Sequence, residues 1–281
     1  KGKLIAKIEK FDAVSNIDEI IEVSDGIMVA RGDLGIEVPY YDVPTIQKML
    51  IKKSNAKGIP VITATQMLLS MTQNERATRA EISDVANAVL DGTDIVMLSE
   101  ESAVGENPVN VVETMHNIIS QTEKIFDHEK RYKFTYLDEF DVIQATVTKL
   151  ADDLSADGIL SLTSSGNSAR KMSRYRPITP LYTFAHDKET LTGLTALWGV
   201  EPITTVKEAQ ASKMIQRMLR SLEKREILNK KGLYICTVGY PVGIPGSTNT
   251  IKILTPSEIE FYLNFKENRE KIKTEKKVNL A

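Results

Sequence analysis

Short apolar runs separated by amphipathic stretches dominate the first half of the chain. Each run is apolar along most of its length, which is typical of parallel strands buried on both faces. The segments between them carry apolar residues at helical spacing and suit βα units joined by right-handed crossovers. Strands are expected at Leu4–Ile8, Gly26–Ala30, Val61–Ala64 and Ile95–Leu98, and helices at Val43–Ala56, Thr78–Leu90 and Val109–Ile125.

A polar and aromatic stretch, residues 127–138, interrupts this pattern and is expected to be a linker. A helix at Asp141–Leu154 and further strands alternating with helices predict a second α/β unit with a doubly wound, parallel sheet. We therefore expect domains at 1–126 and 139–262 and a charged tail at 263–281. The strands of the second unit are expected at Gly158–Leu162, Leu181–Ala185, Glu201–Thr205, Leu233–Val238 and Thr250–Leu254.

Composition narrows the class of protein. The 281 residues are 42% hydrophobic and 26% charged, with a formal net charge of −2, which gives no signal for a nucleic-acid or membrane partner. Cys236 is the single cysteine, so no intramolecular disulfide forms, and a reducing, cytoplasmic location is expected. The chain begins with Lys1 and enters a strand almost at once, so we expect a fragment of something longer.

Polar side chains follow the first three strands. Lys7 and Glu9 lie two residues apart and share one face of the first strand. Asp33 lies in a glycine-rich turn after the second strand, beside Gly32, and Thr65 follows the third strand. Taken singly, they have plain structural readings: a salt bridge at a strand end, an ordinary turn and a helix N-cap hydroxyl.

Together these residues predict an active site. The carboxyl ends of parallel strands meet at the edge where α/β folds bind ligands. Two carboxylates suit Mg²⁺ completed by substrate oxygens and water, and an ammonium stabilises charge on a transferring phosphoryl group. The tripeptide Arg31-Gly32-Asp33 can also be read as an adhesion tag, but that reading requires a secreted chain.

A hydroxyl-rich loop follows the first strand of the second unit. Backbone donors, hydroxyl groups and a helix N-terminus converge there, which favours a phosphate, although a serine-rich turn that caps its own helix is an equal alternative. A second glycine-rich loop, residues 239–249, is expected at the same edge of the sheet. The residues of the first loop are Thr163, Ser164, Ser165, Gly166, Asn167 and Ser168.

Several long stretches resemble the pyruvate kinase family, and the likeness runs from residue 3 to about residue 255. They read AKIEK, SDGIMVARGDLGIEV, PVITATQML, TRAEISDVANAVLDGTDIVMLSEESAVGENP and SRYRP…LWGVEP. The resemblance implies an α/β chain made of the second half of a TIM (β/α)8 barrel, strands five to eight, followed by the C-terminal regulatory domain. It also implies phosphoryl transfer from phosphoenolpyruvate to ADP, giving pyruvate and ATP in glycolysis.

The resemblance assigns roles to individual residues. Lys7 would neutralise the transferring phosphoryl group, and Glu9 and Asp33 would bind Mg²⁺ or Mn²⁺. The backbone of Gly32 and Asp33 would hold the substrate carboxylate, and Thr65 would lie beside the substrate in the proton relay. The family also uses K⁺, a phosphorylated allosteric effector at a loop like residues 163–168, and a homotetramer.

Two departures leave questions open. Glu100 replaces the usual glycine in the family's Ser-Gly-Glu-Thr, which implies either backbone strain or extra negative charge at the active-site mouth. The first four barrel strands, with the K⁺ ligands and much of the nucleotide site, lie outside this sequence, so little kinase activity is expected of this chain alone. A regulatory module that only binds its effector is the main alternative, and another phosphoenolpyruvate-using barrel enzyme ranks below it. Arg170 and Lys171 are the cations nearest the hydroxyl-rich loop, which favours a monophosphate slightly.

Overall fold

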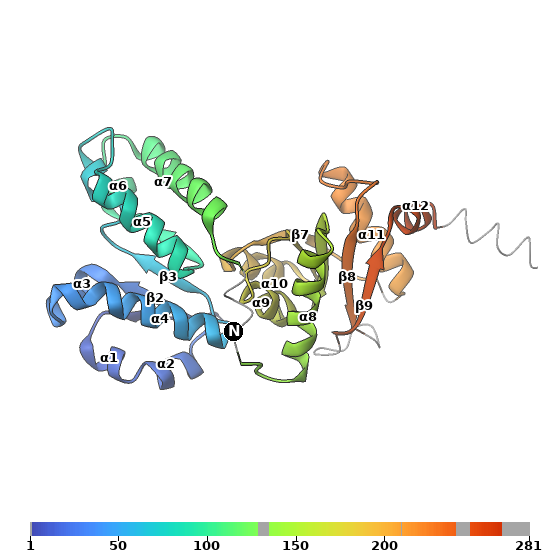
Figure 1. The fold of residues 1–281 in the computed structure, drawn as a ribbon, viewed down its shortest axis with the longest axis horizontal. Coiled ribbons are helices and arrows are strands. Elements are labelled where there is room, and N and C mark those ends of the chain that lie inside the picture. Colours follow the sequence, from blue (N-terminus) through green and yellow to red (C-terminus); the bar gives the residue numbers. More distant parts are fainter. Residues whose placement is uncertain (1, 129–134, 209, 240–247, 266–281) are drawn as a thin grey trace, which may run out of the picture. The chain divides into compact units, whose positions relative to one another are not determined.

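The computed structural model describes residues 2–128, 135–208, 210–239 and 248–265. The chain divides into two compact units, each with a sheet of its own (Figure 1). The first unit comprises Lys1–Thr135 and Ala196–Trp198, and the second comprises Tyr136–Thr195 and Gly199–Ala281. Most of the expected second loop, residues 240–247, and most of the expected tail, residues 266–281, lie outside the described part.

The first unit is built on a four-stranded parallel sheet in the order β1-β2-β3-β4. Its strands are β1 (Ile5–Ile8), β2 (Gly26–Ala30), β3 (Val61–Ala64) and β4 (Ile95–Met97), within one residue of the expected bounds. Each strand neighbours the next one along the chain, as in successive βα units of a barrel. The predicted half-barrel is therefore confirmed.

Helices connect these strands, and their ends follow local chemistry. The α4 helix ends where Gly58 takes a φ of 76°, and α5 ends at Gly92 with a φ of 96°. At the start of α5, Thr78 and Glu81 form a reciprocal capping box. The helices are α1 (Phe11–Ser15), α2 (Ile17–Val23), α3 (Arg31–Glu37), α4 (Val43–Lys57), α5 (Arg79–Asp91), α6 (Glu100–Ala103) and α7 (Pro108–Thr122), with 3₁₀ turns at Tyr40–Asp42, Leu69–Thr72 and Glu123–Ile125.

One face of this sheet packs against the helices. Ile8, Ile27 and Val29 join Leu50 and Ile51 of α4 in a buried cluster. Side chains alternate across a strand, so Lys7 points to the opposite face from Ile8. The polar groups of β1 therefore project from the face that a closed barrel turns inward.

The second unit has a five-stranded sheet in the order β7-β6-β5-β8-β9. Four strands are parallel, but β9 runs antiparallel to β8, which corrects the expectation of an all-parallel sheet. A parallel return needs a crossover of about a dozen residues or more, and the connection from Gly239 to Thr248 is shorter. The strands are β5 (Gly158–Thr163), β6 (Leu181–Ala185), β7 (Val200–Thr205), β8 (Tyr234–Gly239) and β9 (Thr248–Leu254).

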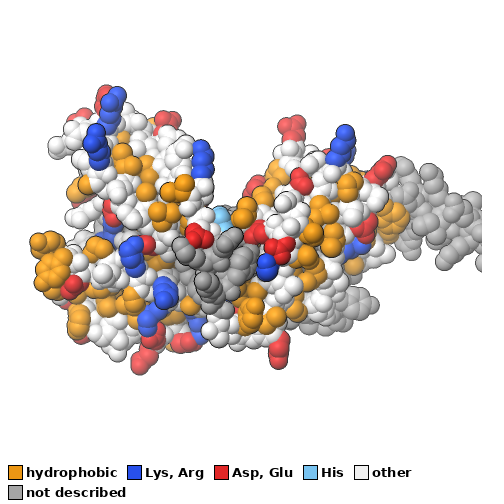
Figure 2. Space-filling model, viewed as in Figure 1, with side chains coloured by type: hydrophobic (Ala, Val, Ile, Leu, Met, Phe, Trp, Pro, Cys, Tyr) orange, Lys and Arg blue, Asp and Glu red, His pale blue; other side chains and the backbone are white. Residues whose placement is uncertain are grey.

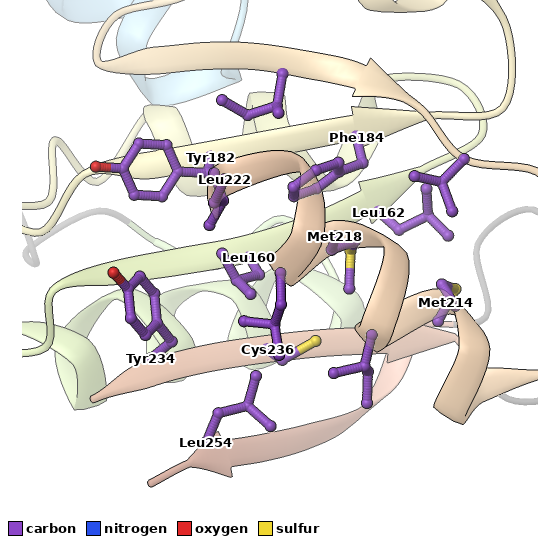
Figure 3. Packing of buried hydrophobic residues seen from close by; sticks show 14 of the residues in the cluster. Leu160, Leu162, Tyr182, Phe184, Met214, Met218, Leu222, Tyr234, Cys236 and Leu254 are labelled. Carbon is purple, nitrogen blue, oxygen red and sulfur yellow. The ribbon is translucent and has the colours of Figure 1, made fainter. Parts of the chain in front are cut away.

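Helices cover both faces of this second sheet, so the doubly wound architecture is confirmed. Met214, Met218 and Leu222 recur every fourth residue of α11 and pack on Leu160 and Cys236 of the sheet (Figure 3). The opposite face is covered by α8 and α9. The helices are α8 (Glu139–Asp153), α9 (Asn167–Ser173), α10 (Lys188–Gly193), α11 (Ala211–Lys224) and α12 (Pro256–Leu263), with a 3₁₀ turn at Leu194–Ala196.

The surface carries both signs of charge. Figure 2 shows acidic and basic side chains scattered over the visible face of both units. Exposed apolar side chains are also present, and Ile36, Tyr40 and Tyr41 after β2 are 85%, 78% and 68% exposed. None of the helices in the described part of the chain combines the length and the apolar character needed to cross a bilayer.

Candidate active site

Three charged side chains meet at the carboxyl ends of β1 and β2. The Lys7 ammonium donates a hydrogen bond to Asp33 Oδ2 at 2.7 Å and a second one to Glu9 Oε2. Glu9 follows β1 directly, and Asp33 lies in the first turn of α3, which begins where β2 ends. The fold therefore joins residues 26 positions apart in sequence, which a lone salt bridge within β1 would not do.

Contacts within this cluster shift the pKa values of Lys7 and Asp33. Hydrogen bonds to Asp33 and then to Glu9 raise the pKa of Lys7 to about 12. The hydrogen bond from Lys7 holds the pKa of the Asp33 carboxyl below its usual range. At neutral pH the cluster holds one ammonium and ionised Asp33, all open to solvent, with Lys7 51% and Asp33 54% exposed.

Thr65 joins this cluster through the backbone. Its Oγ1 accepts a hydrogen bond from the Gly32 amide at 2.9 Å and donates one to the carbonyl of Ala64 at 2.6 Å. The residues that follow form a turn and the 3₁₀ segment Leu69–Thr72, so Thr65 is not the N-cap of an α-helix. The hydroxyl group instead lies at the start of α3, beside Asp33.

The backbone of Thr65 is left-handed, which is rare for a β-branched residue. Thr65 has a φ of 69° and Gln66 a φ of 55°. Such a conformation persists only when the surroundings impose it, and it is commonest at functional sites. The sequence gives no sign of it, because neither residue is a glycine or an asparagine.

Arg31 of the Arg-Gly-Asp tripeptide faces inward. Its side chain is 10% exposed and forms an ion pair with Asp84 of α5 at 2.7 Å. An adhesion tag must present its arginine to a receptor, and this guanidinium is already occupied within the fold. The structure thus argues against the adhesion reading of the tripeptide.

The donor set fits a hard divalent cation. Glu9 and Asp33 both reach the same ammonium group, so their oxygens converge on one place. Mg²⁺ binds through one or two carboxylates and keeps water and substrate oxygens for its other positions. In the described part of the chain no three histidine, cysteine, aspartate or glutamate side chains cluster as a metal site.

Comparison with known proteins agrees with this geometry. The family model described as "Pyruvate kinase, barrel domain" matches residues 1–112, and the model described as "Pyruvate kinase, alpha/beta domain" matches residues 141–254. The chain belongs to the pyruvate kinase family. Both the half-barrel with its charged cluster and the second α/β unit thus correspond to named pyruvate kinase domains.

Individual pyruvate kinases show the same relationship. The protein from Lactobacillus delbrueckii subsp. bulgaricus is 44% identical over 257 residues, covering 89% of this chain and 44% of the relative. That from Clostridium acetobutylicum is 43% identical over 255 residues, covering 89% of this chain and 54% of the relative. A crystal structure of a Cryptosporidium parvum pyruvate kinase superposes with a TM-score of 0.83 at 36% identity, covering 90% of this chain and 51% of that one. The chain therefore spans about half the length of the pyruvate kinases that it matches.

The hydroxyl-rich loop of the pyruvate kinase α/β domain is partly committed to its own fold. Thr163 Oγ1 accepts from the Gly166 amide at 2.9 Å, and Gly166 takes a φ of 85° before α9. Ser168 is buried, with its hydroxyl 3.3 Å from that of Thr248 in β9. Ser165 and Asn167 are exposed, and Ser164 is half-buried.

One of the two cations beside that loop is already neutralised. Lys171 is buried and lies 2.5 Å from both carboxylate oxygens of Asp138, the N-cap residue of α8. The hydrogen bonds from Lys171 keep the pKa of Asp138 below its usual range. Arg170 is half-buried and is the neighbouring cation without this carboxylate partner. Of the two cations nearest the loop in sequence, Lys171 is therefore already paired.

The turn after β4 answers the question that Glu100 raised. Glu100 is exposed and begins α6, and it is not among the described residues with positive φ, so the strain alternative is wrong. The next residue, Glu101, is buried and accepts from the amides of Leu68 at 3.2 Å and Ser99 at 2.7 Å. Sequence reasoning missed Glu101 and Arg31 because nothing in the sequence pairs them with the Thr65 turn.

Proposed function

We propose that this chain contributes half of the active site of a cytoplasmic pyruvate kinase, which transfers a phosphoryl group from phosphoenolpyruvate to ADP. The observation that carries the proposal is the convergence of Lys7, Glu9 and Asp33, with the Gly32 amide and the Thr65 hydroxyl beside them. An ammonium next to two carboxylates can stabilise charge on a transferring phosphoryl group and hold a divalent cation beside it. The complete enzyme would be a homotetramer, as in the family that the chain resembles.

Each residue has a role that follows from its contacts. Glu9 and Asp33 would hold Mg²⁺ or Mn²⁺, which supplies positive charge for the substrate oxygens. Lys7 would stabilise the charge on the phosphoryl group, and its raised pKa keeps it protonated for that role. The Gly32 and Asp33 amides lie in the first turn of α3 and would hold the substrate carboxylate, although the Gly32 amide donates to the Thr65 hydroxyl in this structure. Thr65 would take part in proton transfer to the enolate.

This chain alone is expected to turn over little or no substrate. Its sheet has four strands, which cannot close a barrel, and the K⁺ ligands expected for the family lie in the other half. Pyruvate formation from phosphoenolpyruvate and ADP with Mg²⁺ and K⁺ tests this expectation. Family-like turnover by the isolated chain would contradict it, and any turnover should fall by about 10²–10³-fold in Lys7→Met. Lys3→Met is the matched control, since Lys3 is an exposed lysine paired with Asp25 at 3.1 Å.

Metal binding tests the proposed site without catalysis. Titration of the chain with Mn²⁺, followed by electron paramagnetic resonance of the free ion, should show weaker binding by at least about tenfold in Glu9→Gln and in Asp33→Asn. Asp18→Asn is the control, because Asp18 is 76% exposed and pairs with Lys53 away from this cluster. Equal Mn²⁺ affinity in all three variants would show that the carboxylates do not bind the metal.

A second function is favoured by the α/β domain, which has its own sheet and core. Ser165 and Asn167 are exposed at the start of α9, next to a backbone turn at Gly166 that suits an oxyanion. We propose that this loop binds a phosphorylated allosteric effector. With Lys171 engaged by Asp138, a monophosphate fits the remaining charge better than a bisphosphate.

Calorimetry distinguishes the two phosphate classes. AMP and a sugar monophosphate should bind at least as tightly as a sugar bisphosphate. Arg170→Met should weaken the binding of both phosphate classes. Lys149→Met, which removes an exposed lysine of α8, serves as the control. A bisphosphate that binds much more tightly than a monophosphate would overturn the preference. Heat signals unchanged by Arg170→Met would place the effector elsewhere.

A further inference from the structure

The carbonyl groups of the left-handed turn at Thr65 are held by one side chain, that of Arg31. The Arg31 guanidinium donates to three consecutive carbonyl oxygens, those of Ala64 at 3.4 Å, Thr65 at 2.7 Å and Gln66 at 3.3 Å. Its Nη2 also lies 2.8 Å from the sulfur of Met67. Five N–H donors in one plane allow arginine, unlike lysine, to hold several acceptors at fixed angles.

The guanidinium is itself fixed from the other side. Nη1 donates to both carboxylate oxygens of Asp84, at 2.8 and 2.7 Å, and reaches Gln47 at 3.4 Å. Asp84 belongs to α5 and Gln47 to α4, so two helices anchor the fork. With the side chain 10% exposed, water competes little for these hydrogen bonds.

The turn also has a second attachment at its far end. Glu101, which is fully buried, accepts from the Leu68 amide at 3.2 Å. Residues 64–68 are therefore held through their carbonyl groups by Arg31 and through an amide by Glu101. Positive φ at two consecutive non-glycine residues costs free energy, and this double attachment is the surrounding structure that maintains it.

We propose that Arg31 is a positioning residue for the catalytic site, acting through the Thr65 turn. It does not touch the charged cluster in any contact that the described residues show; it fixes the backbone that carries the Thr65 hydroxyl. That hydroxyl is the acceptor found for the Gly32 amide, which lies in the first turn of α3 and lacks an intrahelical partner. Arg31 thereby sets the distance between Thr65 and the start of α3. The substrate carboxylate is proposed to bind there, so the link between Arg31 and catalysis rests on the proposed function.

Amide hydrogen exchange in this 281-residue chain tests the inference without turnover. Arg31→Lys keeps the positive charge but removes the planar guanidinium with its several N–H donors. In this variant, protection of the Gly32 amide against hydrogen exchange should fall roughly tenfold. The amides of Ile27 and Val29 in the same βα unit should keep their protection. A purely structural role would instead lower the protection of all three amides by one common factor, and that result would overturn the proposal, as would an unchanged Gly32 amide.

A double-mutant comparison shows whether the effect passes through the hydroxyl. Thr65→Ala alone should remove the protection of the Gly32 amide, and adding Arg31→Lys should then change it no further. Additive losses would mean that Arg31 acts by another route. Lys48→Met is the matched control, since Lys48 pairs with Asp91 in the same helical layer and makes no contact with the turn in the described structure.

A kinetic readout connects positioning to chemistry. In a full-length pyruvate kinase that contains this half-barrel, Arg31→Lys should lower kcat roughly 10–100-fold while the KM for phosphoenolpyruvate changes little, since geometry and not charge is lost. An unchanged kcat would contradict a positioning role even if exchange at Gly32 increases. An inactive parent protein would refute the proposed function but leave the exchange result valid.

Discussion

Removing the charge of Asp141 should destabilise the second unit more than removing the charge of an exposed aspartate. Asp141 and Arg174 are 0% and 1% exposed, and Oδ2 of Asp141 lies 2.5 Å from Nη1 of Arg174. The same oxygen accepts from the hydroxyl of Tyr175 at 2.9 Å and from the Leu137 amide at 2.9 Å. Asp141→Asn keeps the shape but removes the carboxylate charge that faces the buried guanidinium.

The expected cost follows from that burial. Breaking a buried ion pair from one side costs about 3–5 kcal/mol, because the remaining charge stays desolvated. An exposed pair four residues apart on a helix contributes about 0.3–0.5 kcal/mol. Lys149 and Asp153 form such a pair on the same helix, 61% and 58% exposed and 3.0 Å apart, so Asp153→Asn is the matched control.

Urea denaturation measures the difference. With a denaturant slope of about 2 kcal/mol per molar, Asp141→Asn should lower the midpoint of the second unit by about 1.5–2.5 M, and Asp153→Asn by about 0.2 M or less. Hydrogen exchange of β5 peptides at each urea concentration assigns the transition to this unit. Equal midpoints for the two variants would refute the reasoning. Replacing both partners, in Asp141→Leu with Arg174→Met, should restore most of the lost stability.

Four further outcomes follow from single contacts. The hydrogen bonds from Lys171 lower the pKa of Asp138 in the folded state, so this contact stabilises the fold above the ordinary pKa near 3.9 and is lost as the pH falls through the lower folded value. The free energy of unfolding of Asp138→Asn should therefore decrease less on acidification than that of the unchanged chain, and the same decrease in both would contradict this. Burial raises the pKa of Cys236 to about 12, so a thiol reagent should modify it only after unfolding, and rapid labelling of the native chain would disprove its burial. Thr78→Ala removes a capping box and should cost about 1 kcal/mol in thermal unfolding, whereas an unchanged Tm would show that the cap contributes nothing. In Gly32→Ala the added methyl group would meet the neighbouring hydroxyl at 3.5 Å, an ordinary contact, so the Tm should hold, and a large loss of stability would mean that this backbone cannot accept a side chain.

The strands of both units could be predicted because their apolar runs are long and bounded by turn residues. The bounds of β2, β3 and β6 are those expected from the sequence. The predicted parallel direction of β9 was wrong. The connection from Gly239 to Thr248 is too short for a parallel crossover, so the sequence already indicated an antiparallel strand. The helices α1 and α6, of five and four residues, were not predicted, because so short a stretch shows no clear period.

Prediction of the candidate site depended on a simple rule. The carboxyl ends of successive parallel strands meet, so Lys7, Glu9 and Asp33 were expected together, and the structure brings them together. The attachment of the Thr65 turn could not be predicted in this way. Arg31 reaches its acceptors because Thr65 and Gln66 have positive φ, which neither residue type predicts. Its counter-ion Asp84 lies 53 positions away in sequence.

The left-handed backbone at Thr65 and Gln66 has a consequence for protein engineering. Selection for heat resistance alone would favour glycine or asparagine at these two positions, because both tolerate positive φ. Such a variant would gain stability but lose the Thr65 hydroxyl that accepts from Gly32. The hydrogen bonds from Arg31 would no longer be needed to maintain the turn. A library of this half-barrel selected for thermostability would therefore lose the hydroxyl to which the proposed function assigns proton transfer, so both codons should be held fixed.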